Sequence, residues 1–289
     1  MSSSLGALAS VDWSVLLGSS SGSSYGISAA LLQTVVGGVT GTTTDPLTAL
    51  TNAERDESKD VAQVANQPAV ARAIVKFTAA VTGATNVATL LKNPDVLNVL
   101  LTANGLGDQT AYTALATKAL LSDPTDAKSL ANTLPDTRWK TVAQTYNFAA
   151  QGLTVLQDPK VIATIANGYA EVTWRDTLDA TTPGLSNALD FRARANTATT
   201  ADAILGDATF RTVVTTALGI PPQIAYQDIG AQEQAITSHL DIKKLQDPKF
   251  VEGLTQQYLV AMQQSAASTS SSTGSNLFAL AAQSAGLLV

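Results

Sequence analysis

The sequence predicts an all-α protein, a multi-helix bundle of short capped helices. Two observations lead to this prediction. At six places a leucine stands two residues before an Asp or Asn, and apolar residues then recur at intervals of three and four. Persistent alternation of apolar and polar residues, which would indicate strands, is not found along the chain.

The repeated Leu-x-Asp/Asn motif predicts where helices begin. An Asp or Asn side chain accepts a hydrogen bond from the free amides of a first helical turn. Proline follows at once in four copies, and proline is best tolerated at that first position. The expected N-caps are Asn93, Asp123, Asp136, Asp158, Asp207 and Asp247.

The first six expected helices cover the N-terminal half of the charged region. Acidic residues at Glu54, Asp56 and Glu57 suit a first turn, where they interact favourably with the helix dipole. Pro68 opens the next helix, and a stripe of valine and leucine follows Asn93. The expected ranges are 53–67, 68–82, 87–103, 109–121, 127–134 and 137–150.

Five further helices are expected after them. Val161 and Ile162 follow the cap at Asp158 with helical spacing, and turns at residues 181–184 and 219–222 separate later helices. The expected ranges are 159–176, 185–195, 208–218, 224–240 and 248–264. Glycine followed by an apolar residue, at Gly105 and Gly219, predicts a left-handed C-cap for two helices.

The spacing of the caps argues against a repeat array. A solenoid needs a nearly fixed period, and successive caps here lie at irregular distances. An old duplication of a helical hairpin stays open, most visibly between residues 91–106 and 205–220.

Composition excludes several classes of function. The 289 residues carry a net charge of −6, and the 17 Lys and Arg residues form no basic run, which argues against nucleic acid as a partner. No cysteine is present, so disulfides and thiolate catalysis are excluded.

Charged residues are concentrated in the middle of the chain, and their distribution divides the chain into three parts. Residues 1–52 form a Ser/Gly-rich segment whose only charges are Asp12 and Asp45, with an apolar piece at 27–39. Residues 53–264 form the helical domain, and residues 265–289 form an uncharged C-terminal segment. The Ser-rich stretches 18–26 and 265–275 are interpreted as flexible linkers.

The apolar pieces of the two ends have two interpretations. They are tails with incidental apolar residues, or they are interaction segments that wait for a partner. Neither is long enough to span a membrane. No Lys or Arg precedes Arg55, so a cleaved signal peptide is not expected. The candidate interaction residues are Leu31, Leu32, Val35, Val36, Leu277, Phe278, Leu280, Leu287 and Leu288.

The search for chemistry yields no catalytic, cofactor-binding or metal-binding residue. The G-x-S-x-G pattern within residues 18–26 arises from the Ser/Gly bias. The single histidine, His239, lies late on an expected helix, where interaction with the helix dipole is the common role. The protein is therefore not expected to be an enzyme and needs no cofactor.

A polar set brackets the turn at Pro183-Gly184. We expect an arginine–carboxylate network that ties two helices together there, rather than an acid/base pair. The set comprises Glu171, Trp174, Arg175, Asp176, Asp190, Arg192 and Arg194.

The segment from Asp126 to Trp139 resembles a family signature, D-x-K-S-F-A-N-x-L-x-D-x-R-Y, with Leu130 in place of Phe and Trp139 in place of Tyr. The family is called domain of unknown function 1217. The resemblance covers roughly residues 90–260 and includes Asn147-Phe148-Ala149, Ala188-Leu189-Asp190-Phe191, Leu205-Gly206-Asp207 and Leu245-Gln246-Asp247.

The resemblance implies a biological setting but no activity. Members of the family occur mainly in alphaproteobacteria and are often encoded beside flagellar genes. A secreted, self-assembling structural or accessory protein of the bacterial flagellum is therefore expected, with a role in motility and with other flagellar subunits or itself as partners. The alternative is a cytoplasmic helical binding module that acts as a chaperone or assembly factor.

Overall fold

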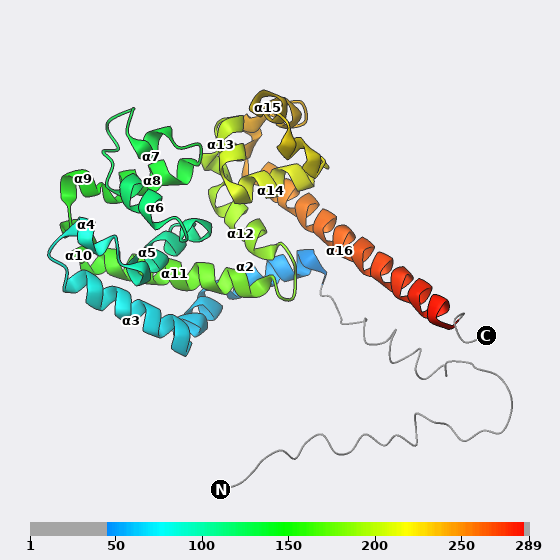
Figure 1. Cartoon of the computed structure of the whole chain (residues 1–289), viewed down its shortest axis with the longest axis horizontal. Coiled ribbons are helices and arrows are strands. Elements are labelled where there is room, and N and C mark those ends of the chain that lie inside the picture. The colour runs from blue at the N-terminus through cyan, green and yellow to red at the C-terminus, as the bar shows by residue number, and fades with distance from the viewer. Residues whose placement is uncertain (1–44, 286–289) are drawn as a thin grey trace, which may run out of the picture. The chain divides into compact units, whose positions relative to one another are not determined.

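The computed structural model describes residues 45–285, with side chains up to Ala266. Its regular elements are all helical, as predicted, and Figure 1 labels most of them. The first half holds α2 (Pro46–Ala65), α3 (Pro68–Thr82), α4 (Val87–Leu90), α5 (Pro94–Ala103), η1 (Gly107–Gln109), α6 (Thr113–Leu120), α7 (Leu130–Thr133), α8 (Thr137–Tyr146), α9 (Phe148–Gln151) and α10 (Thr154–Gln157).

The second half begins with the long helix α11 and ends with α16. It holds α11 (Pro159–Leu178), α12 (Leu185–Arg194), η2 (Ala195–Thr197), α13 (Ala201–Gly206), α14 (Ala208–Ala217), η3 (Pro222–Tyr226), α15 (Ile229–Thr237), η4 (Ile242–Gln246) and α16 (Pro248–Ala285). Within the described part of the chain, no helix combines the length and apolar character that a membrane span requires.

The structure confirms five of the six predicted N-caps. The side chains of Asn93, Asp136, Asp158, Asp207 and Asp247 each accept a hydrogen bond from a backbone amide of the following turn. The sixth prediction is wrong. Asp123 accepts a hydrogen bond from the backbone amide of Thr125 at 2.8 Å, but this closes a local turn, and no helix begins there.

The two predicted glycine C-caps are also confirmed. Gly105 and Gly219 have φ angles of 72° and 66°, in the left-handed region that glycine adopts without steric cost. The amides of Leu106 and Ile220 then donate back to carbonyls of the last helical turn, each at 2.8 Å. Both apolar side chains are buried, as this capping motif requires.

The prediction of one helix over 87–103 is wrong, because two helices, α4 and α5, meet there. Asn93 and Pro94 cause the break: proline has no amide to donate within a helix, so it starts α5. In the same way, the helix predicted over 137–150 is divided at Asn147, whose φ of 38° is left-handed.

Other helix boundaries differ from the predicted ones, because short turns are hard to recognise from the sequence. The range 224–240 covers the end of η3 and all of α15, while the ranges 109–121 and 127–134 contain the shorter helices α6 and α7. The helices α10 and α13 were not predicted, since each is too short to show a periodic apolar pattern.

Two predicted helices are longer than expected. Asp45 and Pro46 start α2 well before residue 53, again as a capping Asp followed by proline. At the other end, α16 continues to Ala285, so the stretch 265–275 is helical and its interpretation as a linker is wrong. No proline interrupts the chain between Pro248 and Ala285, and proline is the residue that most strongly breaks a helix. Residues 18–26 and the apolar piece 27–39 lie outside the described residues.

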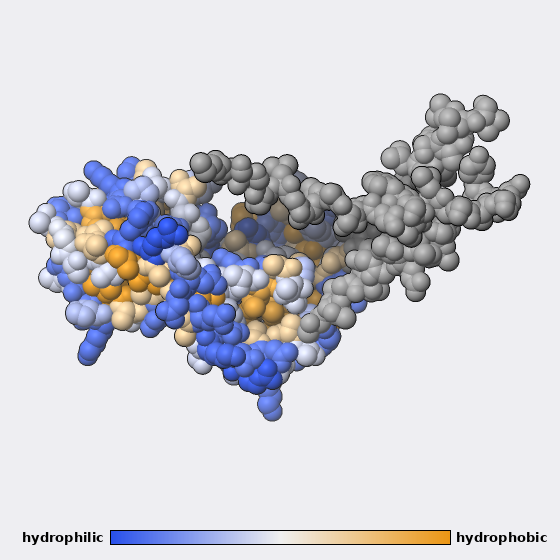
Figure 2. All heavy atoms as spheres, turned by 90° about the horizontal axis from the view of Figure 1, so that it is seen from below, coloured by the Kyte–Doolittle hydropathy of each residue, from blue (hydrophilic) through white to orange (hydrophobic). Residues whose placement is uncertain are grey.

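The helices enclose two hydrophobic cores. The first core lies among α2, α12, α14 and α16 and includes Trp174, Phe191 and Phe210. The second core lies among α3, α5, α6 and α8 and includes Phe77 and Trp139. The face drawn in Figure 2 shows separate apolar patches between polar side chains.

Helix α11 belongs to both cores. Its first half contributes Ile165 to the second core, and its second half contributes Ala170 and Trp174 to the first. It packs closely on α5, where a Cβ atom at Gly168 would lie 3.0 Å from the carbonyl oxygen of Ala103. One continuous helix thus contributes buried side chains to both cores.

Helix α16 is held on the body by a fully buried tyrosine. The hydroxyl of Tyr258 lies against Gly184, where a Cβ atom would be only 2.6 Å away, and Gly184 has a φ of 86°. The side-chain amide of Asn187 donates to the same hydroxyl at 3.4 Å. Helix α16 also packs on α2, so the first and last described helices are neighbours.

Candidate functional site

Within the signature segment, Asp136 and Arg138 bond to each other, and Arg138 gathers further partners around it. This arginine lies in the first turn of α8, and only 6% of its side chain is exposed. Its Nε and Nη2 atoms donate to the carboxylate of Asp136 at 2.7–3.1 Å, and Asp136 also accepts the Arg138 backbone amide at 3.0 Å. The same carboxylate therefore caps the helix and pairs with the guanidinium.

Arg138 has further partners from outside its own helix. Its Nη1 and Nη2 atoms donate to the two carboxylate oxygens of Asp108 at 3.0 Å each, and Nη1 donates to the carbonyl oxygen of Gly105. Planar, two-pronged contacts of this kind are the strongest that arginine forms with carboxylates. Arg138 thus joins α8 to the η1 region.

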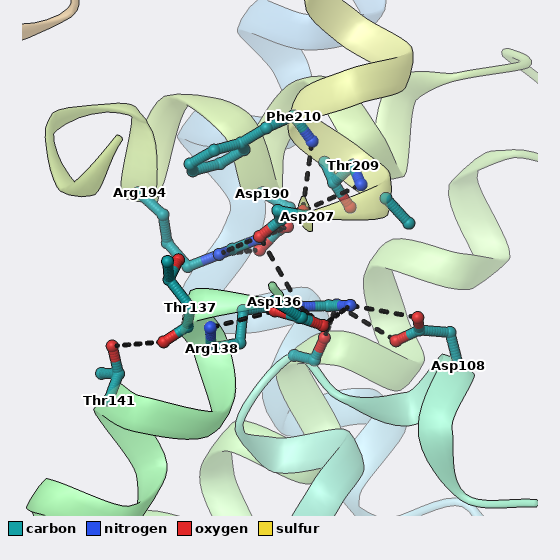
Figure 3. Close-up of polar contacts among 12 residues, drawn as sticks. Asp108, Asp136, Thr137, Arg138, Thr141, Asp190, Arg194, Asp207, Thr209 and Phe210 are labelled. Atoms are coloured by element: carbon teal, nitrogen blue, oxygen red, sulfur yellow. Dashed lines mark hydrogen bonds and ion pairs between the residues drawn. The ribbon is translucent and has the colours of Figure 1, made fainter. Parts of the chain in front are cut away.

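A second capping carboxylate lies beside Arg138. Asp207 is 1% exposed, and its Oδ1 atom accepts the backbone amides of Thr209 and Phe210 at the start of α14. Its Oδ2 atom lies 2.8 Å from Nη1 of Arg194 and 3.6 Å from Nε of Arg138. Figure 3 shows Asp207 between these two arginines.

The close approach of two Leu-x-Asp motifs produces this arrangement. Gly206, which precedes Asp207, lies so near Pro135, which precedes Asp136, that a Cβ atom would come within 2.1 Å of the Pro135 carbonyl oxygen. Only glycine allows the two chain segments to pass at this distance. The two capping carboxylates therefore end up on either side of one guanidinium.

The network continues along α12 and α11. Arg194 donates to Asp190, with Nε at 2.9 Å from Oδ1, and its guanidinium lies 4.7 Å from the centroid of the Phe210 ring. Asp190 also pairs with Arg175 at 3.4 Å, and Arg175 pairs with Glu171. We call the whole set the Arg138 cluster; it comprises Asp108, Asp136, Arg138, Glu171, Arg175, Asp190, Arg194 and Asp207.

Pairing within the cluster favours the ionised forms of Arg138 and Asp190. Burial lowers the pKa of Arg138, but the hydrogen bonds and charge of Asp136, together with Asp207 and Asp108, raise it above its ordinary value. Burial raises the pKa of Asp190, yet its bonds to Arg194 and the charge of Arg175 outweigh burial and lower it. The buried ions are thus compensated by pairing.

Three cavities, of about 330, 440 and 360 Å³, open around the cluster, and Arg138 lines all of them. Their walls combine paired charges with threonine and alanine side chains. Within the described residues, His, Cys, Asp and Glu side chains form no group that could hold a metal ion. The Nε atom of Arg175, next to the cavities, is buried without a hydrogen-bond partner.

The predicted arginine–carboxylate network is largely confirmed. Glu171, Arg175, Asp190 and Arg194 do tie α11 to α12. Arg192 instead pairs with Glu54 of α2. The members contributed by the signature segment were missed. Their sequence signal is Asp136 and Arg138 two residues apart, directly after a leucine and a proline.

The other candidates lie elsewhere. His239 is exposed, and its Nδ1 atom lies 2.8 Å from the Ser238 hydroxyl and 3.1 Å from the Ala235 carbonyl oxygen, near the end of α15. Leu31, Leu32, Val35, Val36, Leu287 and Leu288 lie outside the described residues. The backbone of Leu277, Phe278 and Leu280 belongs to α16, but the described side chains end before them.

The family described as "Protein of unknown function (DUF1217)" matches residues 103–251, just over half of the chain. The chain belongs to the DUF1217 family. The matched range contains every member of the Arg138 cluster, so the cluster lies within the DUF1217 region, while α2 and the later part of α16 lie outside it.

The DUF1217 chain is also similar to a solved structure. The X-ray crystal structure of protein AGR_C_984 from Agrobacterium tumefaciens, a target of the Northeast Structural Genomics Consortium, matches with a TM-score of 0.65 and 24% identity. The match covers 77% of this chain and 94% of that one, and it shows a shared fold. The comparison with curated proteins gave no match.

Proposed function

We propose that this DUF1217 protein is a non-enzymatic structural or accessory component of the bacterial flagellum. It assembles on other flagellar subunits, or on further copies of itself, through its two apolar terminal segments. It acts at the flagellum or outside the cell. The frequent proximity of family genes to flagellar genes gives this proposal its biological setting.

The observation that carries the proposal is the packing of α2 on α16. Residues 1–45 lead into α2, and α16 leads toward the C-terminus, so both terminal segments are attached to neighbouring helices. A single partner surface can therefore engage both segments. Tyr258 and Leu259 are buried in the first core and anchor α16 there. The part of α16 after Leu259 is therefore attached to the packed body of the protein.

The bonds within the Arg138 cluster support a structural role for the signature segment. Arg138 is bonded to Asp108 and Asp136, and Asp207 is bonded to α14 amides and to Arg194. Catalytic groups need a free proton acceptor or nucleophile within reach of a substrate. Here the carboxylates cap helices and join helices from the two cores.

The proposal is tested by locating the protein and its truncated forms. Full-length chain is expected in sheared filaments after cells are fractionated into cytoplasm, periplasm and filaments. Chains that lack residues 1–45 or 265–289 keep the buried anchors of both cores, so they are expected to stay helical by circular dichroism but to leave the filament fraction. Unchanged filament association of both truncated chains would contradict the proposal.

A second candidate is a cytoplasmic helical binding module that acts as a chaperone or assembly factor. The exposed side chains of Tyr226 and Ile229 favour it, because such residues offer a surface to a client. Full-length protein confined to the cytoplasmic fraction, in cells that carry filaments, would support this candidate over the first.

A further inference from the structure

The order of helices in the first part of the described chain is repeated in the second part. Helix α2 is followed by α3, α4, α5 and η1, and α11 is followed by α12 with its extension η2, then α13, α14 and η3. Each series opens with a helix of 20 residues that an Asp caps and a Pro starts, at Asp45-Pro46 and Asp158-Pro159. We call residues 45–106 the N-terminal unit and residues 158–220 the C-terminal unit.

From α3 and α12 onward, equivalent residues of the two units keep one spacing. Six pairs that play the same part are each 114 residues apart: Phe77 and Phe191, Leu91 and Leu205, Asn93 and Asp207, Val99 and Val213, Gly105 and Gly219, and Leu106 and Ile220. The apolar members of these pairs are all buried, and both glycines are left-handed. Self-similarity at a fixed spacing is the sequence signature of repeated units.

The hydrogen bonds that start the helices repeat in the same register. The side chains of Asn86 and Thr200, also 114 residues apart, accept the amides three residues further on at 3.0 and 3.1 Å. The side chains of Asn93 and Asp207 accept the amides two residues further on at 3.0 and 2.9 Å. Capping residues are common at helix starts, but chance does not place two successive caps, a core phenylalanine and a C-cap glycine in one register. The two units are therefore two copies of one building block.

The two units exchange their first helices. Helix α2 packs on α12, α11 packs on α3, and α2 and α11 pack on each other (Figure 1). Leu50 and Val64 of α2 belong to the first core, which α12, α14 and α16 mainly build, and Ile165 of α11 belongs to the second core. An ion pair between Glu54 of α2 and Arg192 of α12 crosses the same contact. Each core thus contains a helix from the other unit.

We propose that the N-terminal unit and the C-terminal unit are docking partners of each other through these exchanged helices, so the interface fits a further unit of the same kind. Exchange of an identical element between copies is a low-cost route to association. In this chain both copies are supplied by one polypeptide. The inference goes beyond the flagellar proposal and is independent of it, because residues 1–44 and the later part of α16 take no part.

The experiment cuts the folded full chain between the two units. A protease recognition sequence is inserted between Gln151, which is exposed, and Gly152, where an added Cβ atom would meet nothing within 4 Å. After cleavage, the pieces 1–151 and 152–289 are expected to elute together in size-exclusion chromatography, with unchanged helicity by circular dichroism. After separation in urea, each piece alone is expected to lose helix and to regain it when the two are mixed.

Substitutions at the contact between α2 and α12 show whether the exchanged helix holds the pieces together. Leu50→Ala removes a buried side chain from the first core and is expected to raise the Kd of the two pieces by at least about tenfold. Arg192→Glu places two negative charges together and should raise the Kd by about threefold or more, while the added Glu54→Arg should restore it. Lys76→Glu is the matched control, because its partner Asp95 lies in the same piece, and it should leave the Kd unchanged.

Several results would overturn the proposal. Pieces that separate without denaturant would show that the units do not dock on each other. A piece that regains its full helicity alone would show that its core needs no helix from the other unit. A Kd that neither Leu50→Ala nor Arg192→Glu changes, or that Lys76→Glu raises as much as Arg192→Glu does, would show that α2 does not hold the pieces together.

Discussion

The Nε atom of Arg138 lies 3.6 Å from the Oδ2 atom of Asp207, and this contact joins two helix starts that are far apart in the chain. Asp136 caps α8 beside Arg138, and Asp207 caps α14. Arg138 thus places one positive charge between two capping carboxylates. The residues that start these helices also hold the helices together.

Replacing Arg138 should destabilise the protein strongly. Arg138→Met keeps most of the volume but leaves the nearly buried carboxylates of Asp136 and Asp207 without this cation. Loss of one partner from a buried ion pair costs about 3–5 kcal/mol. Urea unfolding followed by circular dichroism measures the change. Arg55→Met, which removes an exposed arginine paired with Asp56, should leave stability unchanged, and equal effects of the two substitutions would refute the prediction.

A double-mutant cycle should detect direct coupling between Arg138 and Asp207. Asp207→Asn keeps an oxygen that can accept the α14 amides, so it removes charge while it preserves the cap. The coupling energy with Arg138→Met is expected to reach about 0.5–3 kcal/mol. The exposed pair Lys76 and Asp95, at 3.3 Å, serves as the reference and should couple by about 0.5 kcal/mol or less. If the two substitutions change the free energy of unfolding additively, the contact between Arg138 and Asp207 contributes nothing to stability.

Gly206→Ala should be destabilising although it adds only one methyl group. The new Cβ atom would meet the Pro135 carbonyl oxygen at 2.1 Å, so the two Leu-x-Asp segments must move apart. Overpacking of this kind costs about 1–3 kcal/mol. Gly253→Ala is the matched control, since a Cβ atom there has no neighbour within 4 Å. That change should be neutral or stabilise α16 by about 0.5–1 kcal/mol. Equal tolerance of both substitutions in thermal unfolding would count against the close approach.

The contribution of Asp190 to stability should depend on pH. Its folded-state pKa is lower than the ordinary value because Arg194 and Arg175 outweigh the effect of burial. Folding therefore gains stability from Asp190 above its unfolded pKa, near about 4, and loses it as the pH falls through the lower folded pKa. Asp190→Asn should cost about 3 kcal/mol at neutral pH. The difference from wild type should shrink below about pH 4 in urea unfolding at several pH values. A difference that stays constant in acid would show that the charge of Asp190 is not responsible.

The sequence by itself determined the fold class and most helix starts of this protein. Capping is a local interaction, since Asp158 and Asp247 accept amides only two residues further on, and the motif is therefore readable without the fold. The left-handed glycines at Gly105 and Gly219 are local for the same reason. The DUF1217 resemblance could be read from the same caps and core residues.

The tertiary structure determined which of these capped helix starts contact one another. The approach of Gly206 to Pro135 brings Asp207 to Arg138, and no spacing in the sequence indicates that contact. Ion pairs between distant segments depend on how helices pack, and packing is set by the shapes of both cores together. The exposure of Tyr226 is likewise a property of the folded chain, because the same tyrosine would have been an equally good core residue.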